Sequence, residues 1–215
     1  MKLRPYQTPA IQHLLDTPRC ALWADMGMGK TLAVLLYLDG LRLLGLDGPV
    51  LILGPKFVCT NVWPVEAKKW GFDFDVVPIV GSPTQRRAAL ASPAPVKCIN
   101  YDNIQWLLDE LNGAWPFHTV IADESTRLKS FRTRQGGKRT QALSFIADRT
   151  QRWVNLTGTP APNGLTDLWG QTWFLDQGKR LGATYTAFKE RWFTPTWNGY
   201  GVEPRPFAME QIQAA

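Results

Sequence analysis

The sequence predicts an α/β fold in which a central, mostly parallel β-sheet carries helices on both faces. Short runs rich in valine, isoleucine and leucine recur along the chain, and segments of helical length separate them. Strands that are buried on both faces and joined by crossover helices have this pattern. A composition of 45% hydrophobic and 20% charged residues fits a globular protein with one sizeable core.

The expected elements alternate from the start of the chain. Strands are expected at residues 20–24, 50–53, 75–80, 96–100, 119–122 and 152–156. Helices are expected at residues 9–15, 30–44, 61–70, 84–90, 103–111, 138–147 and 164–174. Thr8 is the expected cap of the first helix, because Pro9 then takes the first helical position, which proline favours.

The end of the chain has a different character. The strand signal stops after residue 175, and a helix-like stretch is followed by turn-forming residues at 194–206. Two interpretations stay open: a helical or irregular connector toward a second lobe, or an extension packed back on the domain. The expected division is therefore a main domain at residues 1–175 and this segment at 176–215.

Charge and cysteine usage restrict the setting of the protein. The formal net charge of +6 suggests an anionic partner without identifying it. Cys20, Cys59 and Cys98 are widely spaced and form no metal or disulfide pattern. The first residues lack the apolar segment of a signal peptide, and no stretch approaches a membrane span, so no membrane partner is expected. The expected compartment is a reduced cytoplasm, the host's if the protein is viral.

The strongest motif is ADMGMGKT at residues 24–31, which follows an expected strand and opens an expected helix. Such a loop turns backbone N–H groups toward phosphate oxygens, and the helix adds its positive end. Lys30 is expected to contact the β and γ phosphates, and Thr31 to place its hydroxyl on Mg²⁺. Ala24 stands where the general pattern has glycine. The rest of the expected phosphate loop is Asp25, Met26, Gly27, Met28 and Gly29.

A second motif places two adjacent carboxylates, Asp123 and Glu124, at the end of an apolar strand. Ligands of parallel sheets bind at the carboxyl ends of the strands. Asp123 is expected to hold Mg²⁺, and Glu124 to orient and deprotonate the attacking water. With Lys30, these residues form the expected catalytic set of a nucleotide hydrolase.

Other functions fit parts of this pattern. A small phosphotransferase would use the same phosphate loop, but would need an acceptor pocket and an arginine-bearing lid. A non-catalytic nucleic-acid clamp would keep the shape of the fold without turnover. A GTPase is disfavoured because the sequence has no Asn-Lys-x-Asp motif to read guanine. The rate of ATP hydrolysis with and without DNA separates these possibilities.

The chain resembles superfamily 2 helicases, and most closely the Swi/Snf-like ATPases, in the order and spacing of six motifs. The similar segments are LRPYQ (residues 3–7, motif Q), DMGMGKT (25–31, motif I), 51–70 (Ia), INYDNI (99–104, Ib), DESTRLKS (123–130, II) and 156–169 (III). The resemblance implies the N-terminal, RecA-like P-loop lobe of an ATP-hydrolysing DNA helicase or translocase, with ATP and Mg²⁺ as ligands. It also implies double-stranded DNA and a second RecA-like lobe as partners.

The resemblance assigns further roles. Gln7 would hydrogen-bond the adenine edge. The residues that would contact nucleic acid are Lys56, Asn100, Tyr101, Arg127 and Lys129. Thr157, Gly158 and Thr159 would couple the nucleotide state to the DNA track. Basic residues are also concentrated after motif II, at Arg127, Lys129, Arg132, Arg134, Lys138 and Arg139, which suits contact with a phosphate backbone.

The sequence departs from the helicase pattern at three places. Thr126 stands where many relatives carry histidine or glutamine in motif II, so the coupling between hydrolysis and DNA binding is less certain. Pro162 stands where motif III has glutamine, and it removes a side-chain donor and a backbone N–H. No stretch after motif III resembles the second lobe with its arginine finger.

Overall fold

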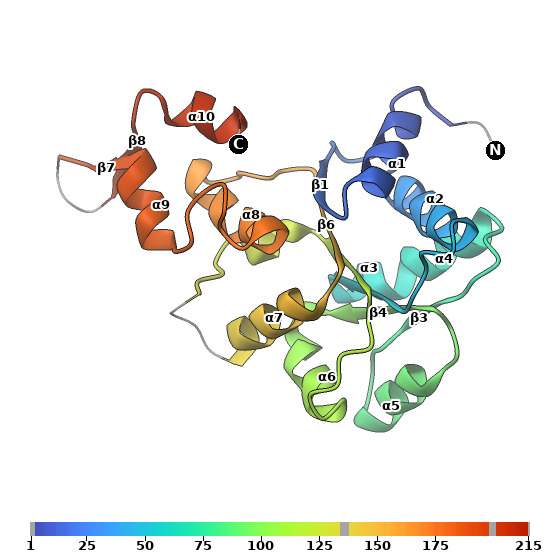
Figure 1. The fold of residues 1–215 in the computed structure, drawn as a ribbon. Coiled ribbons are helices and arrows are strands. Elements are labelled where there is room, and N and C mark those ends of the chain that lie inside the picture. The colour runs from blue at the N-terminus through green and yellow to red at the C-terminus, as the bar shows by residue number, and fades with distance from the viewer. Residues whose placement is uncertain (1–2, 134–137, 198–200, 215) are drawn as a thin grey trace.

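A central parallel sheet organises the protein, whose computed structural model describes residues 3–133, 138–197 and 201–214. Six strands pair in the order β1-β6-β5-β2-β4-β3, and every pairing is parallel (Figure 1). The strands are β1 (Arg19–Trp23), β2 (Val50–Gly54), β3 (Val76–Pro78), β4 (Val96–Asn100), β5 (Thr119–Asp123) and β6 (Arg152–Thr157). The expected α/β class and the six expected strands are confirmed.

Helices connect these strands and cover both faces of the sheet. They are α1 (Gln7–Asp16), α2 (Lys30–Leu43), α3 (Lys56–Asn61), α4 (Trp63–Lys69), α5 (Pro83–Ala91), α6 (Ile104–Glu110), α7 (Lys138–Arg149) and α8 (Leu168–Asp176). Short 3₁₀ helices are η1 (Tyr101–Asn103), η2 (Ser125–Leu128) and η3 (Leu165–Asp167). None of the described helices is long and apolar enough to cross a membrane.

Two hydrophobic cores form because alternate residues of each strand point to opposite faces. In β2, Leu51 and Leu53 pack with apolar residues of α6, α7 and α8, whereas Val50 and Ile52 pack with residues of α1, α2 and α4. All of β2 is buried. The fold therefore buries the central strands on both sides, as their nearly continuous apolar sequence predicts.

Several helix boundaries differ from the sequence-based expectation, and the helix expected at 164–174 is the 3₁₀ helix η3 followed by α8. Thr8 does not cap the first helix, which begins at Gln7 after Tyr6, and no side chain caps it. The helix expected at residues 61–70 is two helices separated at Val62. Pro64 explains the break, because proline has no N–H to continue the hydrogen bonding of α3.

The end of the chain contains two strands that the sequence did not predict. Strands β7 (Phe193–Pro195) and β8 (Val202–Pro204) form an antiparallel pair between α9 (Tyr185–Trp192) and α10 (Ala208–Ala214). The expectation of no strand beyond residue 175 was wrong, because three-residue strands are too short to show a periodic apolar pattern.

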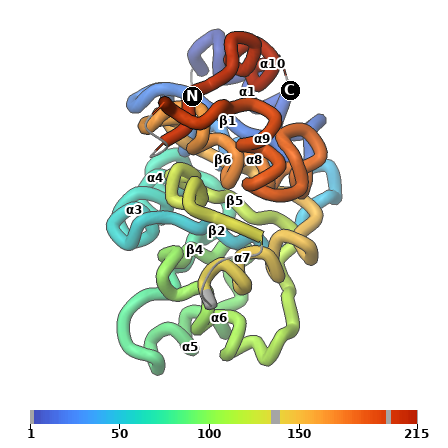
Figure 2. Tube along the Cα trace, turned by 90° about the vertical axis from the view of Figure 1, so that its left-hand side faces the viewer, coloured from blue at the N-terminus to red at the C-terminus, as the bar shows by residue number. Residues whose placement is uncertain are grey.

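This C-terminal segment packs on the lobe. Phe188, Trp192 and Ile212 belong to the same hydrophobic core as Phe174 of α8. Figure 2 shows α8, α9 and α10 gathered at the end of the sheet where β1 and β6 lie. The described residues of this segment thus pack on the domain, and its role as a connector toward a second lobe stays a prediction. The boundary at residue 175 stays a prediction.

Candidate functional site

Three loops with functional motifs emerge side by side at one edge of the sheet. Strands β1, β6 and β5 are parallel neighbours, so their carboxyl ends meet at that edge. Trp23 pairs in register with Thr157, and Asp123 pairs with Leu156. The phosphate loop, the motif III loop and the Asp-Glu pair therefore converge at the position where parallel sheets bind ligands.

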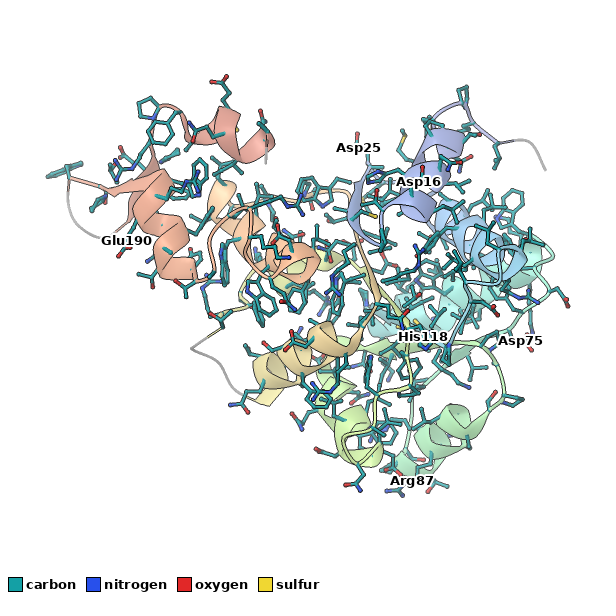
Figure 3. The ribbon with its side chains drawn as sticks, viewed as in Figure 1. Asp16, Asp25, Asp75, Arg87, His118 and Glu190 are labelled. Carbon is teal, nitrogen blue, oxygen red and sulfur yellow. The ribbon has the colours of Figure 1, made fainter. Side chains whose placement is uncertain are left out.

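The phosphate loop connects β1 to α2, as predicted. Gly29 precedes α2 with φ of 73°, a left-handed conformation that glycine adopts without strain. The Lys30 ammonium donates hydrogen bonds to the carbonyl oxygens of Ala24 (2.6 Å) and Asp25 (3.1 Å). Met26 is exposed, and Asp25 projects from the upper edge of the molecule in Figure 3. The loop is thus open to solvent, and Lys30 lies across it.

Gln7, which belongs to motif Q before the first strand, is buried next to this loop. Its Oε1 accepts a hydrogen bond from the backbone N–H of Arg4 at 2.9 Å. Its Nε2 donates to the carbonyl oxygen of Gly29 at 3.3 Å. A β-carbon at position 29 would lie only 2.6 Å from that Nε2. Gln7 therefore packs directly against the phosphate loop, and its contact with an adenine edge stays a prediction.

Asp123 is held from two sides. Its Oδ2 accepts a hydrogen bond from the Trp63 indole N–H at 2.9 Å, and its Oδ1 accepts one from the Glu124 backbone N–H at 3.0 Å. Burial raises the pKa of Asp123 to about 6, and the nearby Glu124 adds to the rise. The Trp63 bond and the charge of Lys30 act in the opposite direction. Asp123 is thus an oriented carboxylate with a raised pKa that lies within the electrostatic reach of Lys30.

Glu124 occupies an uncommon backbone conformation. Its φ is 53°, in the left-handed region that residues other than glycine rarely adopt. The preceding carbonyl, that of Asp123, accepts a hydrogen bond from the Tyr101 hydroxyl at 3.0 Å. Such conformations cluster at functional sites, where the surrounding structure fixes them. The turn presents two adjacent, half-buried carboxylates: Asp123 is oriented by two hydrogen bonds, and Glu124 has a left-handed backbone conformation.

The residues expected to hold Mg²⁺ have suitable chemistry. Thr31 at the start of α2 offers a hydroxyl oxygen, and Asp123 offers a carboxylate oxygen. Magnesium is usually held by one or two such oxygens together with substrate phosphates and water. Among the described residues, no group of three or more histidine, cysteine, aspartate or glutamate side chains could hold a metal. This donor set fits an ion that arrives with a nucleotide.

The residues expected to contact nucleic acid fall into two groups. Lys56, at the start of α3, and Arg127, in η2, are exposed. Lys129 forms an ion pair with Asp167, with 3.5 Å between Nζ and Oδ2. Asn100 is half-buried, and its Oδ1 accepts a hydrogen bond from the Asn103 side chain at 2.7 Å.

Tyr101 was wrongly expected on this surface. Only 1% of its surface is exposed, and its ring packs in the core while its hydroxyl supports Asp123. From sequence, an aromatic residue inside a motif can contact nucleic acid or pack in the core. Tyr101 packs in the core, in the same hydrophobic cluster as residues of α6 and α7.

Some side chains of the basic segment after motif II contact other residues of the protein. The Arg132 guanidinium stacks on the Tyr185 ring at 3.4 Å from its centroid. Arg139 pairs with Asp102 at 3.3 Å. Arg134 and the side chain of Lys138 lie outside the described residues.

The motif III residues contact the phosphate loop directly. Thr157 is buried; its carbonyl oxygen accepts a hydrogen bond from the Ala24 N–H at 3.2 Å, and its hydroxyl accepts one from the Thr159 N–H at 3.1 Å. Gly158 lies so close that a β-carbon there would be 3.4 Å from the Met26 nitrogen. The segment expected to couple the nucleotide state to DNA therefore lies against the nucleotide loop.

Sequence reasoning missed two residues that shape the site. Trp63 lies inside motif Ia and reaches Asp123, which is 60 positions away. Gln171 lies in α8 and accepts a hydrogen bond from Ser125 of motif II at 2.8 Å. The only signal for Gln171 was its polar side chain within the apolar run LWGQTWFL.

Comparisons with known proteins agree with this geometry. Protein p41 of Acyrthosiphon pisum secondary endosymbiont phage 1 is 55% identical over 99% of this chain, which covers 48% of p41. The ATPase ISW1 of the ISWI chromatin-remodeling complex of Saccharomyces cerevisiae is 29% identical over 81% of the chain and 16% of its own length. The chain thus spans about half the length of the phage relative and a smaller part of the remodeling ATPase.

A solved structure shows the same fold. The Sulfolobus solfataricus SWI2/SNF2 ATPase core in complex with dsDNA matches with a TM-score of 0.74 and 22% identity, over 100% of this chain and 42% of that one. The SNF2-related domain family matches residues 6–199, which include motifs I, Ia, Ib, II and III and the end of motif Q. The chain therefore belongs to the SNF2-related domain family, whose members are nucleotide-binding ATPases of the helicase class.

Proposed function

We propose that this chain is the N-terminal lobe of a DNA translocase, which binds MgATP and hydrolyses it together with a second RecA-like lobe. The convergence of Lys30, Asp123 and Glu124 at one edge of the sheet carries the proposal. The charge of Lys30 acts on Asp123, and motif III contacts the phosphate loop. A phosphotransferase would need an acceptor pocket and an arginine-bearing lid and would not need motif III against the phosphate loop, so the arrangement favours a helicase-type ATPase.

The chemistry assigned to the site is hydrolysis of the terminal phosphate bond. Backbone N–H groups of the phosphate loop and the start of α2 would hold the phosphates, and Lys30 would exchange its two carbonyl partners for phosphate oxygens. The oxygen of a water molecule would attack the γ phosphorus while Glu124 accepts a proton from that water. The bond between the γ phosphorus and the oxygen that bridges to the β phosphate would break, and ADP would leave. Thr31 and Asp123 would hold Mg²⁺, which neutralises charge on the phosphates when it is bound.

We expect low activity from this chain alone, because a second lobe would supply a group that acts on the γ phosphate. An arginine that reaches the γ phosphate contributes about 10³ to 10⁵ in rate where it has been measured. The described residues place their phosphate-binding groups on an exposed loop. We therefore assign that arginine to a second lobe, in the same parent chain or in a partner. The three free cysteines support action in a reduced cytoplasm, which would be that of the host if this chain, like its relative p41, is a phage protein.

Double-stranded DNA is the proposed track because the Sulfolobus neighbour was solved with it. Lys56→Glu combined with Arg127→Glu is expected to weaken DNA binding about equally for all sequences and to flatten its salt dependence, as loss of phosphate contacts does. Both side chains are exposed, so the change leaves the core intact. Fluorescence anisotropy at several low salt concentrations measures the effect. We leave Lys129 unchanged because reversing its charge would also break its ion pair with Asp167.

The matched control reverses Lys68 on α4 and Lys179 just after α8, both of which are exposed. It makes the same change in net charge at another place. Equal loss of DNA binding in both double variants would show a general charge effect and remove Lys56 and Arg127 from the track.

A further inference from the structure

We propose that Gln171 is a positioning residue that joins the turn carrying Glu124 to the loop after motif III, so that nucleotide and DNA binding influence each other through it. The inference deepens the proposed function and rests on it. Gln171 contacts no ligand in this account. It acts through Ser125, which directly follows Glu124.

The side chain of Gln171 is fully buried, and both the oxygen and the nitrogen of its amide are hydrogen-bonded. Its Oε1 accepts a hydrogen bond from the Ser125 hydroxyl at 2.8 Å. Its Nε2 donates to the carbonyl oxygens of Pro160 at 2.6 Å and of Asp167 at 3.1 Å. A buried amide costs free energy unless it is hydrogen-bonded, and here three partners from three segments satisfy it. The amide therefore connects motif II, the motif III loop and η3.

A second contact joins the same segments. Lys129, downstream of Ser125 in motif II, pairs with Asp167 at 3.5 Å. The same carboxylate oxygen accepts a hydrogen bond from the backbone N–H of Asn163 in the motif III loop at 2.9 Å. We call Ser125, Lys129, Asp167 and Gln171 the α8 clasp.

Helix α8 approaches motif II too closely for an ordinary side chain at position 170. A β-carbon on Gly170 would lie 2.8 Å from the carbonyl oxygen of Lys129 and closer still to that of Leu128. Both contacts are with backbone, which cannot move aside like a flexible side chain. Glycine thus permits the approach that brings Gln171 to Ser125.

The clasp lies between the two parts that must respond to each other. On one side, Ser125 fixes the end of a turn in which Glu124 has φ of 53°. On the other side, Pro160 follows the end of β6, where Thr157 accepts the Ala24 N–H of the phosphate loop, and Lys129 of the clasp is one of the residues expected to contact DNA. A shift of the motif III loop is therefore transmitted to the catalytic turn through Gln171. This connection uses neither Thr126 nor Pro162, the two positions where the sequence departs from the helicase pattern.

The test measures the coupling between two ligands in the chain of residues 1–215. A fluorescent ATP analogue with Mg²⁺ is titrated with and without saturating double-stranded DNA, and the ratio of the two dissociation constants is the coupling factor. Such factors are typically about 5 to 150. Gln171→Met keeps the length of the side chain and removes its hydrogen bonds. We expect its coupling factor to fall to about one, with affinity for the analogue in the absence of DNA unchanged.

A variant with two changes separates coupling from stability. Ser125→Ala combined with Gln171→Met leaves neither the hydroxyl nor the amide without its partner, which is better tolerated than removing one alone. It is expected to be folded and uncoupled, and it replaces Gln171→Met if the single variant does not fold. Gln141→Met, at an exposed position of α7, is the matched control and should keep the coupling of the parent.

The outcomes distinguish this inference from the proposed function. A folded Gln171→Met or double variant with the coupling factor of the parent overturns the role of Gln171. A parent that binds both ligands without coupling overturns it as well. A parent that binds neither the analogue nor DNA overturns the proposed function and, with it, this inference.

Discussion

Lys30→Ala is expected to abolish detectable binding of a fluorescent ATP analogue. Lys30 starts α2, and its ammonium spans the phosphate loop by donating to the carbonyl oxygens of Ala24 and Asp25. It is the cation that this loop can present to the β and γ phosphates. Titration of the analogue in the presence of Mg²⁺ measures the loss.

The control for this variant is Lys68→Ala, which removes an exposed lysine from α4. It should bind the analogue as the parent does. Lys30 also makes hydrogen bonds within the loop, so its loss could affect folding. Urea unfolding of both variants checks that they are folded. Unchanged affinity in folded Lys30→Ala would place the nucleotide elsewhere.

Glu124→Gln is expected to retain affinity for ATP and to lose about 10² to 10⁴ in turnover, the usual contribution of a general base. The amide can still orient water but cannot take its proton. Glutamine and glutamate have the same backbone preferences, so the strain at φ of 53° is unchanged. Turnover is measured with the second lobe present, where the parent rate is expected to be high enough to follow.

Glu190→Gln provides the comparison, because Glu190 is an exposed carboxylate on α9, and Figure 3 shows it well apart from Asp25 of the phosphate loop. It should hydrolyse ATP at the rate of the parent. Equal rates for Glu124→Gln and the parent would mean that another group takes the proton.

The position of the candidate site could be predicted from sequence because it depends on strand ends. Apolar runs mark the strands, and parallel pairing brings their carboxyl ends to one edge. The phosphate loop after β1 and the Asp123–Glu124 pair after β5 were therefore expected at the same edge, and the strand order β1-β6-β5 brings them close. Local signals were sufficient at these positions, since each motif directly follows its strand.

Contacts between distant positions were beyond the reach of local signals. Trp63 and Asp123 are 60 positions apart, and Ser125 and Gln171 are 46 apart. Their hydrogen bonds depend on how α4 and α8 pack on the sheet, which composition and periodicity do not specify. Tyr101 was mispredicted for a related reason. Its motif suggested a position on the surface, but packing against distant residues buries it.

The most direct test of this account is the rate of ATP hydrolysis by residues 1–215, measured with and without double-stranded DNA and again with a second RecA-like lobe supplied in the same chain or by a partner. The account predicts slow or undetectable hydrolysis by this chain alone, whether or not DNA is present. It predicts a rise of about 10³ to 10⁵ when the second lobe brings its arginine, and a rate that then depends on DNA. Fast, DNA-stimulated hydrolysis by residues 1–215 as a monomer would contradict it.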